Sequence, residues 1–105
     1  MHYVVANRVF VKPAFTAEFE QRFAVRAGQI DQQPGFVRME ILRPRSNDTP
    51  YVVLTYWQDE SAFNDWVGSD DFKRAHSNPM PKEAFQPGGG LEQYQIVNSA
   101  SGYES

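Results

Sequence analysis

The segment Tyr51–Trp57 (YVVLTYW) constrains the fold most, because it carries large apolar side chains on both of its faces. It is built from β-branched and aromatic residues and contains no glycine or proline, which predicts a β-strand. Alternate side chains of a strand point to opposite sides of the sheet, so this strand has to be covered on both sides. The residues of one face are Tyr51, Val53 and Trp57, and those of the other are Val52, Leu54 and Tyr56.

Strands and helices alternate along the rest of the chain. Residues 3–11, 36–43 and 91–97 have the composition and alternation of further strands. Aromatic and aliphatic residues at near-helical spacing predict a helix from about Thr16 to Gln29, with Thr16 as its N-cap. Asp59 and Ser69 are the predicted N-caps of two short helices, and a loop rich in proline and glycine at 77–90 precedes the last strand.

This order, β-α-β-β-α-β, predicts a ferredoxin-like α+β fold with helices on one face of a four-stranded antiparallel sheet. One protomer can cover only one face of the central strand in this arrangement. We therefore expect a homodimer in which two sheets pack face to face, a dimeric α+β barrel. A monomer with an exposed apolar face is the alternative.

Composition narrows the possible functions. The 105 residues are expected to form a single domain, 1–105, with a loose polar tail from about residue 99. The net charge of −3 argues against a nucleic-acid partner. The chain has no cysteine, which excludes disulfides, thiolate metal sites and cysteine nucleophiles. No apolar run is long enough for a membrane span, and a cytoplasmic location is expected.

Asn7 interrupts an otherwise apolar row of the first strand, formed by Tyr3, Val5, Val9 and Val11. If this row is buried, the carboxamide needs hydrogen-bond partners, because an unpaired one costs about 1–3 kcal/mol. Either the neighbouring backbone supplies these partners or a ligand does. The sequence leaves both possibilities open.

His76 lies on the apolar stripe of the second short helix, beside Phe72 and Ala75. A neutral imidazole held by a helix is a good ligand for haem iron, although a lone histidine is more often structural. Trp66 on the preceding helix is either part of the core or part of a pocket. Arg22 and Arg26, one helical turn apart and flanking Phe23, could bind carboxylates such as haem propionates. No motif for nucleotide binding, zinc proteolysis or a catalytic triad is present.

Four stretches of the chain form a recognisable set: ANR at 6–8, RFAVRAG at 22–28, PGF at 34–36 and FNDWVGSDDFKRAH at 63–76. Together they resemble the IsdG-type haem-degrading monooxygenases of the antibiotic biosynthesis monooxygenase superfamily. The fourteen-residue block is the most specific part, whereas the segment after His76 matches that family poorly. The resemblance implies a catalytic set of Asn7, Trp66 and His76, with Arg22, Phe23 and Arg26 around the pocket.

In the implied activity, haem is both substrate and cofactor, and the ring is opened with O2 and electrons from a reductase or small-molecule reductant. His76 would be the axial iron ligand, Asn7 a hydrogen-bond donor to the oxygen species or the ring, and Trp66 the residue that distorts the porphyrin. The products would be iron and a bilin-type chromophore. The alternatives are a cofactor-independent monooxygenase of aromatic quinols, a non-catalytic haem-binding protein, and a structural dimeric barrel without haem affinity.

Overall fold

A computed structural model describes residues 2–102, with the side chains of residues 25–28 outside that description. The elements follow the predicted order, and the second helical region consists of two short helices. Short 3₁₀ helices precede α1 and β4. The bounds are β1 Tyr3–Val11, η1 Pro13–Phe15, α1 Thr16–Ile30, β2 Phe36–Leu42, β3 Tyr51–Trp57, α2 Glu60–Val67, α3 Asp70–Ala75, η2 Lys82–Ala84 and β4 Phe85–Gln95.

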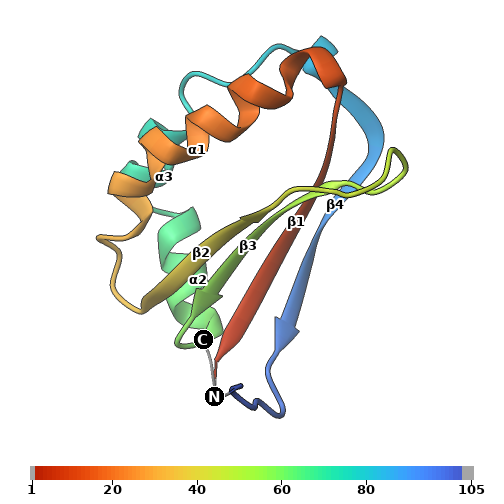
Figure 1. Cartoon of the computed structure of the whole chain (residues 1–105). Helices are drawn as coiled ribbons and strands as arrows, with labels where there is room; N and C mark the ends of the chain where they lie inside the picture. The colour runs from red at the N-terminus through yellow and green to blue at the C-terminus, as the bar shows by residue number, and fades with distance from the viewer. Residues whose placement is uncertain (1, 103–105) are drawn as a thin grey trace.

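The four strands form one antiparallel sheet in the order β2-β3-β1-β4. The helices lie on one side of this sheet and leave its other side open (Figure 1). Trp57 at the end of β3 is fully buried on the helix-covered side, where it packs edge-on against Phe36 and Phe63. The predicted ferredoxin-like α+β fold is confirmed.

The two short helices begin at their predicted N-caps. The carboxylate of Asp59 accepts a hydrogen bond from the amide of Ala62, at 2.9 Å. The hydroxyl of Ser69 accepts one from the amide of Phe72, at 3.1 Å. Each cap satisfies an amide that has no partner within its own helix, which is why these residue types start helices.

Thr16 does not cap α1, so that prediction is wrong. Thr16 already has helical dihedral angles, φ −67° and ψ −39°, because the 3₁₀ turn Pro13–Phe15 runs directly into the helix. Its hydroxyl donates to the carbonyl oxygen of Pro13, at 3.2 Å, and therefore does not cap the helix.

The last strand begins at Phe85, six residues before the predicted start at Leu91. The glycines at 88–90 were predicted to be loop, but they lie within β4, where its register with β1 shifts between Arg8 and Phe10. Gly88 has φ +111°, and a Cβ at Gly89 would lie 2.3 Å from the carbonyl oxygen of Arg8. An irregular strand thus requires glycine here. From sequence alone, a glycine in an irregular strand cannot be distinguished from a glycine in a loop.

Two apolar clusters lie between the sheet and the helices. One contains Val5, Ile30, Trp57, Trp66 and Ala75, and the other Phe19, Tyr51, Met80 and Ala84. Within residues 2–102, no helix is long and apolar enough to cross a bilayer.

Candidate functional site

A cavity of about 310 Å³ lies between the helix-covered face of the sheet and the helices, within the size range of small-molecule sites. Strands form its floor, and α1, α2, α3 and the segment after α3 form its walls. The lining is mainly aliphatic and aromatic. Its main polar groups come from Asn7, Arg22, Thr55 and His76.

Five of the six predicted site residues line this one cavity: Asn7, Arg22, Phe23, Trp66 and His76. They come from β1, α1, α2 and the end of α3, so only the folded chain brings them together. The side chain of the sixth, Arg26, lies outside the described residues.

The carboxamide of Asn7 is exposed to the cavity, and the row that contains it is only partly covered. Asn7 lies opposite Val53 on β3 and Leu91 on β4, and neither side chain can form a hydrogen bond with it. Among the described residues the Asn7 side chain has no hydrogen-bond partner. Its two N–H donors and its oxygen are therefore available to a molecule in the cavity.

His76 follows the last residue of α3, and its ring orientation is fixed by a contact within one helical turn. Nδ1 lies 2.8 Å from the carbonyl oxygen of Phe72, and the two rings stack with centroids 4.1 Å apart. Because a carbonyl oxygen can only accept, Nδ1 carries the hydrogen and Nε2 of the neutral ring keeps its lone pair. Nε2 is thus left as one nitrogen with a lone pair in a defined orientation.

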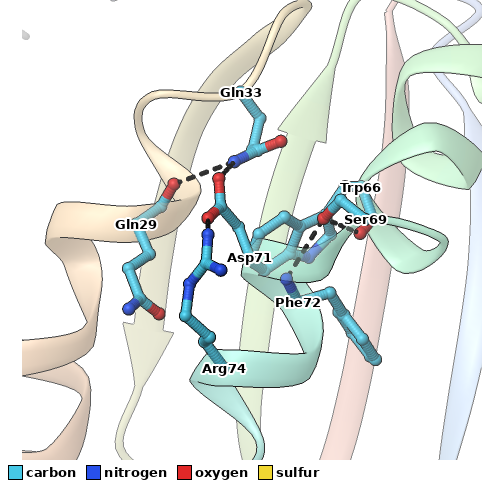
Figure 2. A network of polar contacts seen from close by, with 7 residues as sticks. All are labelled: Gln29, Gln33, Trp66, Ser69, Asp71, Phe72 and Arg74. Atoms are coloured by element: carbon cyan, nitrogen blue, oxygen red, sulfur yellow. Dashed lines mark hydrogen bonds and ion pairs between the residues drawn. The ribbon is translucent and has the colours of Figure 1, made fainter.

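The helix α3, which carries Phe72 and directly precedes His76, is held by a polar network (Figure 2). Nε2 of Gln33, after the end of α1, donates to the carboxylate of Asp71 at 2.9 Å and to the carbonyl oxygen of Gln29 at 3.2 Å. Arg74 pairs with the same carboxylate. The hydrogen bonds from Gln33 and Arg74 lower the pKa of Asp71. The network fixes α3 relative to the end of α1.

Trp66 on α2 packs against α3, and it belongs both to the wall of the cavity and to the core. It is 6% exposed, and its ring packs edge-on against Phe72 with centroids 5.4 Å apart. The hydroxyl of Ser69 donates to the carbonyl oxygen of Trp66 at 2.7 Å, which fixes the turn between α2 and α3. Trp66 is therefore both a core residue and a rigid flat surface of the cavity.

No group of three or more His, Cys, Asp or Glu side chains suited to a metal ion occurs in the described part of the chain. One free imidazole nitrogen in an apolar cavity suits a metal whose other ligands come from elsewhere. Haem meets this condition, because its macrocycle supplies four nitrogens. Its flat apolar ring also matches the aromatic lining, so the residues fit haem.

Residues 2–78 match the sequence family of antibiotic biosynthesis monooxygenases. The chain belongs to the antibiotic biosynthesis monooxygenase family. A haem oxygenase (staphylobilin-producing) of Staphylococcus haemolyticus is 38% identical over 79 residues, which cover 72% of this chain and 74% of that protein. The predicted resemblance to the haem-degrading members is confirmed.

Two solved structures resemble the chain over nearly its whole length. The haem-degrader MhuD of Mycobacterium tuberculosis, with two haems bound in its active site, has a TM-score of 0.77 and 28% identity, covering 94% of this chain and 99% of that one. SnoaB, a cofactor-independent oxygenase from Streptomyces nogalater, has a TM-score of 0.66 and 28% identity, covering 93% of this chain and 93% of that one. The fold alone thus accommodates both kinds of oxygenase.

In this family member, Arg22 lines the cavity but is already engaged by other residues. Its guanidinium pairs with Glu18 at 3.0 Å and donates to the carbonyl oxygen of Asn78, in the segment after His76. A carboxylate in the cavity would compete with these partners. Next to Arg22, the ring of Phe23 packs edge-on against Phe19, with centroids 5.0 Å apart.

Sequence reasoning missed one polar residue of the cavity, Thr55 on β3. Thr55 interrupts the apolar row of Tyr51, Val53 and Trp57 just as Asn7 interrupts the row on β1. This interruption was visible in the sequence. The contact of Arg22 with Asn78 and that of Asp71 with Gln33 were not, because each joins segments far apart in the chain.

Proposed function

We propose that this chain is a haem-degrading monooxygenase that binds haem in the cavity between His76 and Asn7 and opens the ring with dioxygen and an external electron donor. The observation that carries the proposal is a free imidazole nitrogen and an unpaired carboxamide lining the same apolar cavity. The haem oxygenase of S. haemolyticus and the haem-bound MhuD support the same activity.

His76 is the proposed ligand to the haem iron, through Nε2. The hydrogen bond from Nδ1 to the Phe72 carbonyl oxygen keeps the ring in one orientation and makes Nε2 a stronger donor. Stacking on Phe72 restricts rotation of the ring. When bound, haem supplies the iron that activates dioxygen and the ring that is cleaved.

Asn7 is the proposed hydrogen-bond donor on the floor of the cavity. Its carboxamide is fixed to the central strand β1, which is paired on both sides, so the donor is held in place before the substrate arrives. Trp66 lines the cavity with a rigid indole, which would press against a bound porphyrin and strain it. The apolar lining excludes water from the reacting ring.

A hemin titration followed by reduction in air tests this proposal. The complex should show a Soret band, and ascorbate with catalase present should bleach it, release iron and leave a bilin-type spectrum. A Soret band that never forms contradicts haem binding. A complex that survives reductant and air unchanged indicates a non-catalytic haem-binding protein, and oxidation of an aromatic quinol by metal-free protein indicates the cofactor-independent alternative.

We also propose that the open face of the sheet is the interface of a homodimer. On this face Val52 is paired with Leu42, and Leu54 with Ala6. Leu42 is 44% exposed and Tyr94 is 51% exposed in the single chain. Exposed apolar side chains on an uncovered sheet face are typical of a protein interface, and a second copy supplies a matching face.

Analytical ultracentrifugation tests the dimer. The wild type should sediment with twice the 12.0 kDa mass of the chain. Leu42→Glu should shift it toward the monomer, whereas Val67→Glu, a similarly exposed position on α2, should not. A wild-type monomer at high concentration would contradict the proposal.

The cytoplasmic location expected from the sequence stays a prediction.

A further inference from the structure

Thr55 is a buried polar residue on the cavity face of β3. It is 7% exposed, and its hydroxyl oxygen accepts a hydrogen bond from Nε1 of the fully buried Trp57, at 2.9 Å. A hydroxyl also has one hydrogen to donate. Among the described residues, no acceptor for the Thr55 hydroxyl hydrogen is present.

A buried donor without an acceptor destabilises a protein, so the position of this hydrogen matters. The indole N–H of Trp57 occupies one lone pair of the hydroxyl oxygen and thereby turns the hydroxyl hydrogen away from the indole. Thr55 lines the cavity, and the core around it is otherwise apolar. The cavity is therefore where an acceptor can be placed.

Thr55 and Asn7 are neighbours across two paired strands. Val5 lies opposite Thr55, and Asn7 lies opposite Val53, so Thr55 is diagonal to Asn7 on the same face. Residues in such a diagonal pair lie about 7–8 Å apart. One molecule in the cavity can therefore contact both the carboxamide and the hydroxyl.

We propose that Thr55 is a second hydrogen-bond donor of the site and that Trp57 orients it. The hydroxyl donates to an acceptor atom of the molecule held between His76 and Asn7. This inference rests on the proposed function in one respect: the molecule would be haem, whose iron would bind a small ligand within reach of Asn7 and Thr55. The competing explanation is that Thr55 serves only to satisfy the indole N–H of Trp57.

The experiment separates the two roles by removing the indole N–H. Trp57→Phe leaves the Thr55 hydroxyl without a donor to accept from, and Thr55→Val in that background then removes only the hydroxyl. The hemin complexes of both variants are titrated with cyanide, a small anionic ligand of ferric iron. Thermal melts and hemin affinities of the same proteins serve as controls for folding.

The cyanide Kd should be about three- to tenfold higher for the double variant than for Trp57→Phe, the usual effect of losing one hydrogen bond. In the otherwise native chain, Thr55→Ser should bind cyanide nearly as well as the wild type, and Thr55→Val should bind it more weakly. If Trp57→Phe does not fold, the Ser and Val comparison decides the question at equal melting temperature and hemin affinity, because loss of the hydrogen bond to Trp57 would change those two quantities as well.

Equal cyanide Kd values with and without the hydroxyl, in proteins that bind hemin normally, would overturn the role of Thr55 and leave the proposed function intact. A wild type that forms no hemin complex would overturn both. The two failures therefore give different results.

Discussion

Nδ1 of His76 lies 2.8 Å from the carbonyl oxygen of Phe72, one helical turn earlier in the chain. This contact leaves Nε2 as the nitrogen available to a ligand, and the stacked Phe72 ring keeps the imidazole in place. The first turn of the same helix is held by Asp71 and Gln33. The orientation of a single imidazole thus depends on the whole α3 segment.

His76→Ala should weaken hemin binding more than tenfold and remove the spectrum of a histidine-ligated iron, because no other imidazole lines the cavity in the described residues. Absorption titration measures both effects. Added free imidazole should restore the ligand spectrum. His2→Ala, which removes the other histidine at an exposed position, is the control and should bind hemin normally.

Asn7→Ala should retain hemin affinity within about threefold and lose turnover by at least tenfold, since the carboxamide is a donor and not an iron ligand. The rate of Soret bleaching with ascorbate in air measures turnover. Asn47→Ala, in the exposed loop between β2 and β3, is the control. Equal loss of affinity and turnover would show that Asn7 contributes to binding instead.

Asp71→Ala should lower both the melting temperature and the hemin affinity, because it releases α3 from Gln33 and breaks the ion pair with Arg74 inside the helix. Asp70→Ala removes the same charge from the first turn of the same helix, without these side-chain contacts. Thermal melts and hemin titrations of the two variants separate the effect of losing the side-chain contacts from the effect of losing a negative charge near the helix N-terminus. Identical effects would exclude a role of the network in positioning His76.

The stability contributed by Glu20 should depend on pH. Hydrogen bonds from Arg43, at 2.6 and 2.7 Å, and from Tyr51, at 2.5 Å, lower the Glu20 pKa from 4.5 to about 2. Because the pKa of Glu20 is lower in the folded protein than in the unfolded chain, its carboxylate stabilises the folded state at pH values above 4.5. This stabilisation is lost as the pH falls from 4.5 toward 2. The stability difference between wild type and Glu20→Gln should therefore be constant above about pH 5 and shrink below 4.5. Urea unfolding at several pH values measures it, and a difference that grows in acid would contradict it.

Gly89→Ala should destabilise the protein by about 1–3 kcal/mol, as overpacking generally does. The new Cβ would lie 2.3 Å from the carbonyl oxygen of Arg8, a backbone atom that cannot move aside without disturbing β1. Gly90→Ala, at a position with no atom within 4 Å of the new Cβ, should change stability by less than about 0.5 kcal/mol. Urea unfolding of both variants tests whether the irregularity of β4 requires glycine at residue 89 and not at residue 90.

Much of the fold was predictable because its causes are local. The alternation in β1 and β3, the aromatic spacing of α1 and the N-caps Asp59 and Ser69 each act within a few residues. The same patterns, with the family resemblance, indicated the residues of the cavity. Where a local pattern fits two structures, prediction failed: glycines 88–90 are strand, and Thr16 continues a turn that had already begun.

By itself, the sequence determined the strands and helices, the ferredoxin-like order and the presence of an asparagine in an apolar row. Only the tertiary structure decided that the Asn7 side chain is without a hydrogen-bond partner among the described residues, that Arg22 is bound to Asn78, and that Thr55 is the diagonal neighbour of Asn7 across two strands. The physical reason is that hydrogen-bond partners and strand register depend on contacts between segments far apart in the chain. Local propensity and periodicity carry no information about such contacts.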